Sequence, residues 1–310
     1  AIPHEVEEFE DADNHFNCPV VANYPEVIRL NVDDLALNEV DFLQPYLPIG
    51  HLNKLTVRLH EAFGKYGISK SEIVKAVEAA DKEQKIFKDE MRKAGENALI
   101  KVKESGGAGI VLAGRPYHLD PAINHGIPEL IASQEVAVFT EDSVSHLGKL
   151  AYDLDVIDQW VYHSRLYRAA NLVADTKELE LVQLNSFGCG LDAVTADQVE
   201  EILDTAGKTH TLLKIDEGSN LGAVRIRIRS LLATMKDRNS RKQVMKRSIP
   251  QRAPEFTTEM KETHTILCPQ LSPIHFHMMA DCVAPLGYNL EVLPVASKAD
   301  IEEGLKYVNN

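Results

Sequence analysis

The sequence predicts an α/β protein with a Rossmann-like, doubly wound parallel sheet and a second, smaller α/β unit. The first observation is an alternation of short apolar runs and amphipathic stretches between residues 106 and 237. Strands and helices that alternate along a chain form a parallel sheet with helices on both faces. The second observation is that only two further apolar runs follow residue 262, too few for an independent sheet. We therefore expect the second unit to be incomplete by itself.

Residues 1–105 are expected to form a cysteine-bearing segment and two helices that pack with the C-terminal unit. Six acids between residues 5 and 13 predict a solvated arm, with order beginning near Phe16. Apolar spacing predicts a helix over residues 51–63 and a longer one over residues 70–104, which opens with a capping box from Ser69 to Glu72. At 1.5 Å per residue the longer helix would extend on the order of 50 Å.

The central Rossmann-like domain is predicted over residues 106–237 because four short apolar runs alternate with helical patterns there. The expected strands are 109–113, 136–140, 179–184 and 211–215, and the expected helices lie near 128–133, 144–151, 165–174, 195–205 and 221–235. Seven basic residues and one acid between residues 236 and 252 predict a basic linker, placed at 238–262. The partial C-terminal unit, residues 263–310, should contain strands over 263–267 and 290–295 and a last helix over 298–308.

Composition narrows the classes of function. A formal net charge of -14 argues against nucleic acid as a partner, because a phosphate backbone needs a basic surface. No apolar run approaches the roughly 20 residues that cross a bilayer, so no membrane partner is expected. The four cysteines, Cys18, Cys189, Cys268 and Cys282, are too few and too dispersed for a disulfide framework. We expect a cytoplasmic protein whose cysteines serve metal or redox chemistry.

Cys189 stands between two glycines where the third strand of the central domain gives way to a helix. Open α/β sheets bind their ligands outside the carboxyl ends of the strands. Thr195 is the expected cap of the helix that follows. The sequence leaves two interpretations open for Cys189: an accessible, functional thiol, or a buried free cysteine in an ordinary turn.

A loop rich in proline and glycine, residues 113–128, directly follows the first strand of the central domain. Arg115 and Asn124 are candidate substrate-binding residues, since a guanidinium clamps phosphate or carboxylate. Tyr117, His118 and His125 are candidate catalytic residues because they supply a phenol donor and two groups that titrate near neutrality. The alternative is a purely structural loop in which Asn124 serves a turn and the histidines form local hydrogen bonds.

A second candidate metal site lies near the C-terminus. Cys268, His275 and His277 fall within ten residues, with Cys282 five residues further on. Thiol and imidazole ligands suit zinc, but this spacing matches no common zinc module. A zinc or small-ligand-binding α/β domain is kept as an alternative function.

Three motifs together resemble the activase-related proteins of the 2-hydroxyacyl-CoA dehydratase superfamily, whose members are also called CoA-substrate-specific enzyme activases. They are Phe16-Asn17-Cys18-Pro19-Val20-Val21 with Tyr24-Pro25, Gly114-Arg115-Pro116-Tyr117-His118 with Asn124-His125-Gly126, and Phe187-Gly188-Cys189-Gly190 with Asp192-Ala193. The resemblance extends over nearly the whole chain. It implies Rossmann-like domains that each donate a cysteine to a [4Fe-4S] cluster held by three thiolates, with Cys18 and Cys189 as two of those ligands.

The resemblance also implies a function. In the family, the stretch similar to residues 304–310 continues into a cysteine-proline loop, so the chain resembles a fragment that lacks the third ligand. The implied role is an iron–sulfur component that handles low-potential electrons for acyl-CoA dehydration or reduction, of the kind found in anaerobic metabolism. Its implied partners are an ATP-dependent activase module and an acyl-CoA. It would be a dehydratase-like lyase or an electron-transfer component, and the alternative is a non-catalytic docking or regulatory module for an activase.

Overall fold

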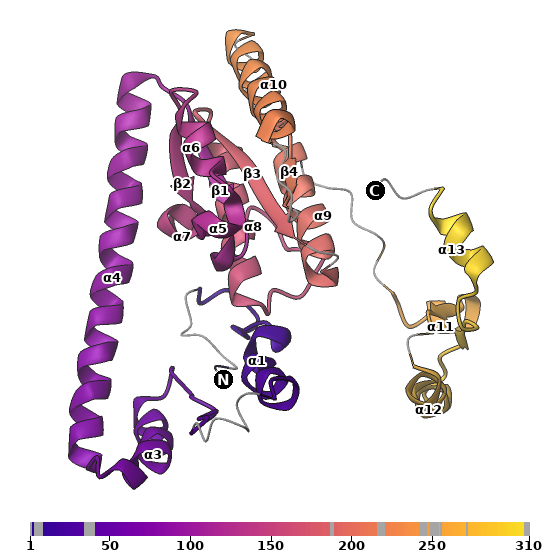
Figure 1. Ribbon diagram of the computed structural model, residues 1–310. Coiled ribbons are helices and arrows are strands. Elements are labelled where there is room, and N and C mark those ends of the chain that lie inside the picture. Colours follow the sequence, from indigo (N-terminus) through magenta and orange to yellow (C-terminus); the bar gives the residue numbers. More distant parts are fainter. Residues whose placement is uncertain are drawn as a thin grey trace. The chain divides into compact units, whose positions relative to one another are not determined.

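The computed structural model divides the chain into two compact units, residues 1–250 and 251–310, shown in Figure 1. The residues that the structure describes are 2, 9–33, 41–186, 189–215, 221–241, 247–248, 254, 256–270 and 272–306. No helix within those ranges is both long enough and apolar enough to cross a bilayer.

Two helices of the N-terminal part, α3 (Leu52–Phe63) and the 36-residue α4 (Lys70–Ser105), follow the predicted pattern closely, whereas α1 (Pro19–Asn31) was not predicted. The short 3-10 helix η1 (Gly64–Tyr66) lies between α3 and α4. The predicted capping box of α4 is present: the Glu72 N–H donates to Ser69 Oγ, and the Ser69 N–H donates to Glu72 Oε2 at 2.9 Å. The helix ends at Gly106, whose φ of 64° is left-handed, a conformation that glycine adopts without strain.

A four-stranded parallel sheet forms the centre of the first unit. Its strands are β1 (Gly109–Ala113), β2 (Ala137–Thr140), β3 (Leu179–Ser186) and β4 (Thr211–Ile215), in the order β2-β1-β3-β4. Ile110 pairs with Val138 of β2 on one side and with Glu180 of β3 on the other. The chain adds β2 on one side of β1 and then places β3 and β4 on the other side, as in doubly wound folds. This topology confirms the predicted fold class.

The two faces of the sheet bury separate apolar clusters. Val111 and Leu181 point to one face, where they pack against helices α4, α7, α8 and α9. Ile110 and Val182 point to the other face, which α6 and α10 cover. Alternate residues of each strand therefore enter opposite cores, and both faces are protected from solvent.

Seven helical segments lie in the described connections between the strands of this sheet, and an eighth, α10, follows β4. They are η2 (Pro116–Leu119), α5 (Pro121–Asn124), α6 (Ile127–Ala132), α7 (Glu141–Val144), η3 (Ser145–Leu147), α8 (Val161–Asp175), α9 (Gly190–Asp204) and α10 (Leu221–Ser240). The helix expected over residues 144–151 is wrong, since helical structure ends at Leu147 and α8 begins only at Val161. The cap expected at Thr195 is also wrong, because Cys189 caps α9 and Thr195 donates to the Leu191 carbonyl inside it.

The described acids of the arm are exposed to solvent, and two of them also bond other residues of the first unit. Asp11 Oδ1 accepts from Arg168 Nη2 at 2.5 Å, and Asp13 Oδ2 accepts from the Asp158 N–H at 2.8 Å. Phe16 then forms a parallel bridge with Trp160, directly before α8. Glu10, Asp11 and Asp13 are exposed, as expected for a solvated arm, but Asp11 also pairs with a buried arginine on a distant helix, which composition alone does not reveal.

The second unit contains a two-stranded parallel sheet. Its elements are α11 (Met260–Thr263), β5 (Ile266–Cys268), α12 (Pro273–Val283), the 3-10 helix η4 (Ala284–Leu286), β6 (Leu290–Val292) and α13 (Lys298–Gly304). Both strands are shorter than predicted. Cys268 is the one buried apolar residue among those described in this unit, which agrees with the expectation of a small second α/β unit.

Candidate functional site

The site lies where the chain leaves β1 and β3 at the same edge of the sheet. β1 is hydrogen-bonded to β2 and to β3, and the chain crosses over β1 between those two strands. The loop after β1 carries Arg115, Tyr117 and His118, and the turn after β3 leads to Cys189. Parallel α/β sheets bind ligands at such a switch point. Phe187 and Gly188, which belong to the predicted cysteine motif, lie outside the described residues.

Arg115 and Asp192 form a buried ion pair at this switch point. Arg115 Nε donates to Asp192 Oδ1 at 2.8 Å, and both side chains are almost fully buried. Arg115 Nη2 lies 3.7 Å from Cys189 Sγ. Burial acts to lower the pKa of Arg115, but Asp192, Cys18 and Cys189 together raise it above its usual value. The guanidinium is therefore a permanent cation beside the thiol of Cys189.

Cys18 lies in the N-terminal segment. It is the residue before α1, just as Cys189 is the residue before α9. The Cys18 N–H donates to Asn17 Oδ1 at 2.8 Å, and the neighbouring Phe16 is held by its bridge to Trp160. Cys18 and Cys189 both help to raise the pKa of Arg115, so both lie within electrostatic range of its guanidinium. Each cysteine also precedes the N-terminal, positive end of a helix.

His118 is held as a neutral ring with a defined tautomer. Its Nδ1 accepts from the Arg115 N–H at 2.9 Å, and its Nε2 lies 3.0 Å from Ser186 Oγ. Burial, with a further contribution from Arg115, lowers the pKa of His118 to about 4. The proton of the neutral ring is therefore on Nε2, which donates to Ser186.

Tyr117 extends this hydrogen-bonded chain. Its hydroxyl lies 2.9 Å from Ser186 Oγ. Burial raises the pKa of Tyr117, so the phenol stays protonated at neutral pH. Because Ser186 already accepts from His118, its own hydroxyl can donate to Tyr117 and leave the phenol proton for another acceptor.

Asn124 and His125 lie further along the same loop. Asn124 is buried, and its Oδ1 accepts from the Gly126 N–H at 3.0 Å. His125 has a φ of 53°, a left-handed conformation that ends α5. Within the described ranges, no hydrogen bond or ion pair joins either residue to Arg115, Tyr117 or His118. Their predicted roles in binding and catalysis therefore stay predictions.

Asp192, which belongs to the cysteine motif of the sequence, joins the cluster together with two residues that the sequence did not single out, Ser186 and His163. Ser186 ends β3, three residues before Cys189, so its position beside the motif could have indicated it. His163 Nε2 lies 3.4 Å from Asp192 Oδ1, and neither ring nitrogen has a hydrogen-bond partner in the part of the chain described. Burial lowers the pKa of His163. Nothing in the sequence around His163 indicates this contact.

The cysteine and histidine side chains of the two candidate metal sites fit the metal groups that the sequence suggests only in part. Cys189 lies beside Arg115 and Cys18 lies within electrostatic range of the same guanidinium, and soft thiolates suit an iron–sulfur cluster. A cluster held by three thiolates needs one more, and among the described residues no three His, Cys, Asp or Glu side chains are grouped to hold a metal ion. The same finding applies to Cys268, His275 and His277; His275 Nδ1 lies 2.8 Å from Ser272 Oγ. The residues present thus fit part of the iron–sulfur ligand set.

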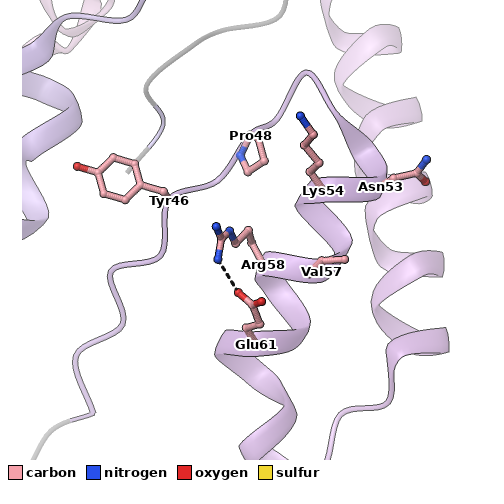
Figure 2. A pocket seen from close by; sticks show the side chains of 7 residues that line it. All are labelled: Tyr46, Pro48, Asn53, Lys54, Val57, Arg58 and Glu61. Atoms are coloured by element: carbon pink, nitrogen blue, oxygen red, sulfur yellow. Dashed lines mark hydrogen bonds and ion pairs between the residues drawn. The ribbon is translucent and has the colours of Figure 1, made fainter.

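A separate pocket of about 630 Å³ lies along α3, as Figure 2 shows. Tyr46 and Pro48 line it from the preceding segment, and Lys54, Val57 and Arg58 line it from the helix. Arg58 Nη1 is paired with Glu61 at 2.9 Å. The pocket shares no lining residue with the cluster around Arg115.

Comparison with known proteins gives one match. Residues 1–144 match a family described as the CoA enzyme activase uncharacterised domain. No curated protein and no solved structure matches the chain. The matched segment includes Cys18 and the loop with Arg115, Tyr117 and His118, and it ends at Val144, before Cys189.

Proposed function

We propose that this activase-related protein is an iron–sulfur redox component that handles low-potential electrons for the dehydration or reduction of an acyl-CoA. The family match indicates a role related to the activation of enzymes that act on CoA substrates. The observation that carries the finer proposal is that Arg115, paired with Asp192, has its Nη2 3.7 Å from Cys189 Sγ, while Cys18 lies within electrostatic range of the same guanidinium. Cysteine thiolates are the usual protein ligands of iron–sulfur clusters.

In this proposal Cys18 and Cys189 are ligands of a [4Fe-4S] cluster. When bound, such a cluster stores and delivers one electron, and its potential responds to nearby charge and hydrogen bonds. Asp192 fixes the orientation of Arg115 through the 2.8 Å bond to Nε and leaves Nη2 directed at Cys189. Removing Asp192 would leave the guanidinium free to turn away from the thiol.

The loop after β1 would bind the substrate and supply a proton. His118 donates through Nε2 to Ser186, and Ser186 can donate to Tyr117, so the Tyr117 phenol is the proton donor that faces a substrate. Arg115 and Asn124 are proposed to bind the acyl-CoA, and His125 is proposed as a second acid or base. An ATP-dependent activase module is the proposed source of the electron.

Anaerobic reconstitution tests the redox role. The purified chain is incubated with iron, sulfide and excess dithiothreitol, whose thiols can occupy a coordination position that the protein leaves open. We expect about four iron and four sulfide per chain, with visible absorption that dithionite bleaches. Both should be lost in Cys18→Ala and in Cys189→Ala, and both should be kept in the control Cys282→Ala, whose thiol is exposed.

The alternative is a docking or regulatory module for an activase that binds no cluster. The finding in its favour is that the described residues offer no group of three ligands. A chain that stays colourless and iron-free after this reconstitution would contradict the redox role and support the docking role.

A further inference from the structure

His163 is a buried polar residue near the start of α8 to which neither the family match nor the proposed redox role assigns a function. It is 2% exposed, and neither of its ring nitrogens has a hydrogen-bond partner among the described residues. A buried polar group without a partner costs free energy, so such groups in folded proteins usually have a functional reason.

The carboxylate of Asp192 lies beside this ring. His163 Nε2 is 3.4 Å from Asp192 Oδ1, and α8 packs against α9, which carries the carboxylate. Burial lowers the pKa of His163, so the ring is neutral at pH 7 and has a proton on one nitrogen only. A nitrogen lone pair would be repelled by the carboxylate. The proton is therefore on Nε2 and is directed at Asp192.

Asp192 Oδ1 is thus approached by two donors from different elements. Arg115 Nε donates to it at 2.8 Å from the loop after β1, and His163 approaches it from α8. A guanidinium can also bind a carboxylate through two nitrogens at once. A second donor on Oδ1 opposes the turn of the carboxylate that such a bidentate pair needs. Arg115 Nη2 then stays at its position 3.7 Å from Cys189 Sγ.

We propose that His163 is a positioning residue for the thiol of Cys189. It acts through Asp192, whose carboxylate it fixes, and so keeps the guanidinium of Arg115 beside the sulfur. The inference rests on the proposed function only in treating Cys189 as the functional thiol. A nearby cation stabilises the thiolate, which is the form of cysteine that reacts with electrophiles and binds metals. His163 should therefore set the reactivity of this thiol.

Alkylation of the reduced, iron-free chain measures this reactivity without a cluster, so a failed cluster reconstitution leaves the result unaffected. The chain is treated with iodoacetamide at pH 7, and peptide mass spectrometry follows the rate at Cys189. The exposed Cys282 of the second unit is the internal reference. We expect His163→Leu to slow alkylation of Cys189 about tenfold relative to Cys282, because the thiolate loses a charge-assisted contact.

Two amide variants separate positioning from packing. The amide nitrogen of glutamine can take the place of Nε2, so His163→Gln should keep the wild-type rate at Cys189. The shorter asparagine places its amide near the position of Nδ1 instead, so His163→Asn is the matched control and should be as slow as His163→Leu. Urea denaturation checks that each variant folds. If His163→Leu does not fold, the comparison of the two amide variants decides the question alone.

A double substitution tests whether the effect passes through Asp192. In the background of Asp192→Asn, His163→Leu should slow alkylation no further, since residues that act as a unit are not additive. A wild-type rate in His163→Leu, equal rates in the glutamine and asparagine variants, or a further loss in the double variant would each overturn the proposal.

Discussion

Gly114 is the residue on which the geometry of the candidate site depends most directly. A Cβ at this position would lie 2.5 Å from His118 Nδ1 and 3.1 Å from the Leu184 carbonyl oxygen. Gly114→Ala should therefore displace His118 and lower the free energy of unfolding by about 1–3 kcal/mol, the usual effect of overpacking. The measurement is urea denaturation at pH 7.

Gly190 provides the matched control for Gly114. A Cβ at Gly190 would have no atom within 4 Å, and the residue is the first of α9. Gly190→Ala should leave the denaturation midpoint unchanged or slightly raised, because alanine favours a helix. Equal effects of the two substitutions would contradict the steric account of Gly114.

His118 makes the stability of the chain depend on pH. Its pKa is about 4 when folded and about 6.5 when unfolded, so the unfolded state binds more protons between these values. Stability is fully present above pH 6.5 and is lost as the pH falls toward 4. From pH 7 to pH 5 this histidine alone should lower the free energy of unfolding by about 2 kcal/mol.

The comparison that isolates this effect is the pH dependence of His118→Gln. Burial also lowers the pKa of His163, and that of His210 to about 4, so the wild type carries three such contributions and the variant keeps two. Urea denaturation at pH 7 and pH 5 should show a smaller loss in the variant by about 2 kcal/mol. The same loss in both proteins would show that His118 is protonated in the folded chain.

The site residues that the sequence predicted have a local sequence signal, whereas His163, which it missed, depends on how helices pack. Arg115, Tyr117 and His118 follow a strand, and Cys189 sits in a strand-to-helix turn, so local patterns indicate that they lie at the carboxyl edge of the sheet. His163 lies inside a helix, and its contact with Asp192 depends on how two helices pack. Such packing has no local signal in a single sequence.

At the scale of elements, Arg168 of α8 holds the segment that precedes Cys18. Arg168 is 1% exposed and bonds Asp158 Oδ2 at 2.8 Å, while its second nitrogen bonds Asp11 and its guanidinium lies 4.1 Å from the centre of the Phe9 ring. Arg168→Gln leaves Asp158 buried without its cation, which should lower the free energy of unfolding by about 3–5 kcal/mol. Local opening should appear as faster hydrogen exchange at the Val161 amide, which donates to the Phe16 carbonyl.

A milder variant and a control accompany this prediction. The Asp11 side chain is 62% exposed, so Asp11→Asn should speed exchange at Val161 with little effect on global stability. Arg29→Gln removes an exposed ion pair with Glu26 on α1 and should leave the exchange at Val161 unchanged. Exchange that stays slow in both Arg168→Gln and Asp11→Asn would show that these contacts do not hold the arm.

The predicted bounds of strands and helices are most accurate where the residues are fully buried. β1 and β4 have the predicted bounds, and every residue of β1 is buried, so the continuous apolar run marks it clearly. After Leu147, where a helix was expected to continue to residue 151, the chain has partly buried apolar residues such as Leu150 that pack on the core without forming a helix. Apolar spacing alone does not separate these two cases.

At the scale of the whole molecule, the positions of the apolar clusters predict how far the stability of the first unit depends on the second. Every buried member of the two apolar clusters lies between Leu99 and Leu231, inside the first unit. The described part of the second unit is mostly exposed, and two strands alone give marginal stability. The sequence also predicts that residues 1–105 pack with the C-terminal unit, and this stays a prediction.

A truncated chain of residues 1–250 tests whether the first unit is stable by itself and whether residues 1–105 pack with the C-terminal unit. Because both cores are complete within this piece, its urea midpoint and its cooperativity should match those of the full chain. Hydrogen exchange in α1 then tests the predicted packing: if the N-terminal segment packs with the C-terminal unit, exchange of the α1 amides should speed up after truncation, while exchange in β1 and β3 stays the same. A midpoint that falls sharply would contradict the independence of the first unit, since stabilisation would then come from residues outside its two cores.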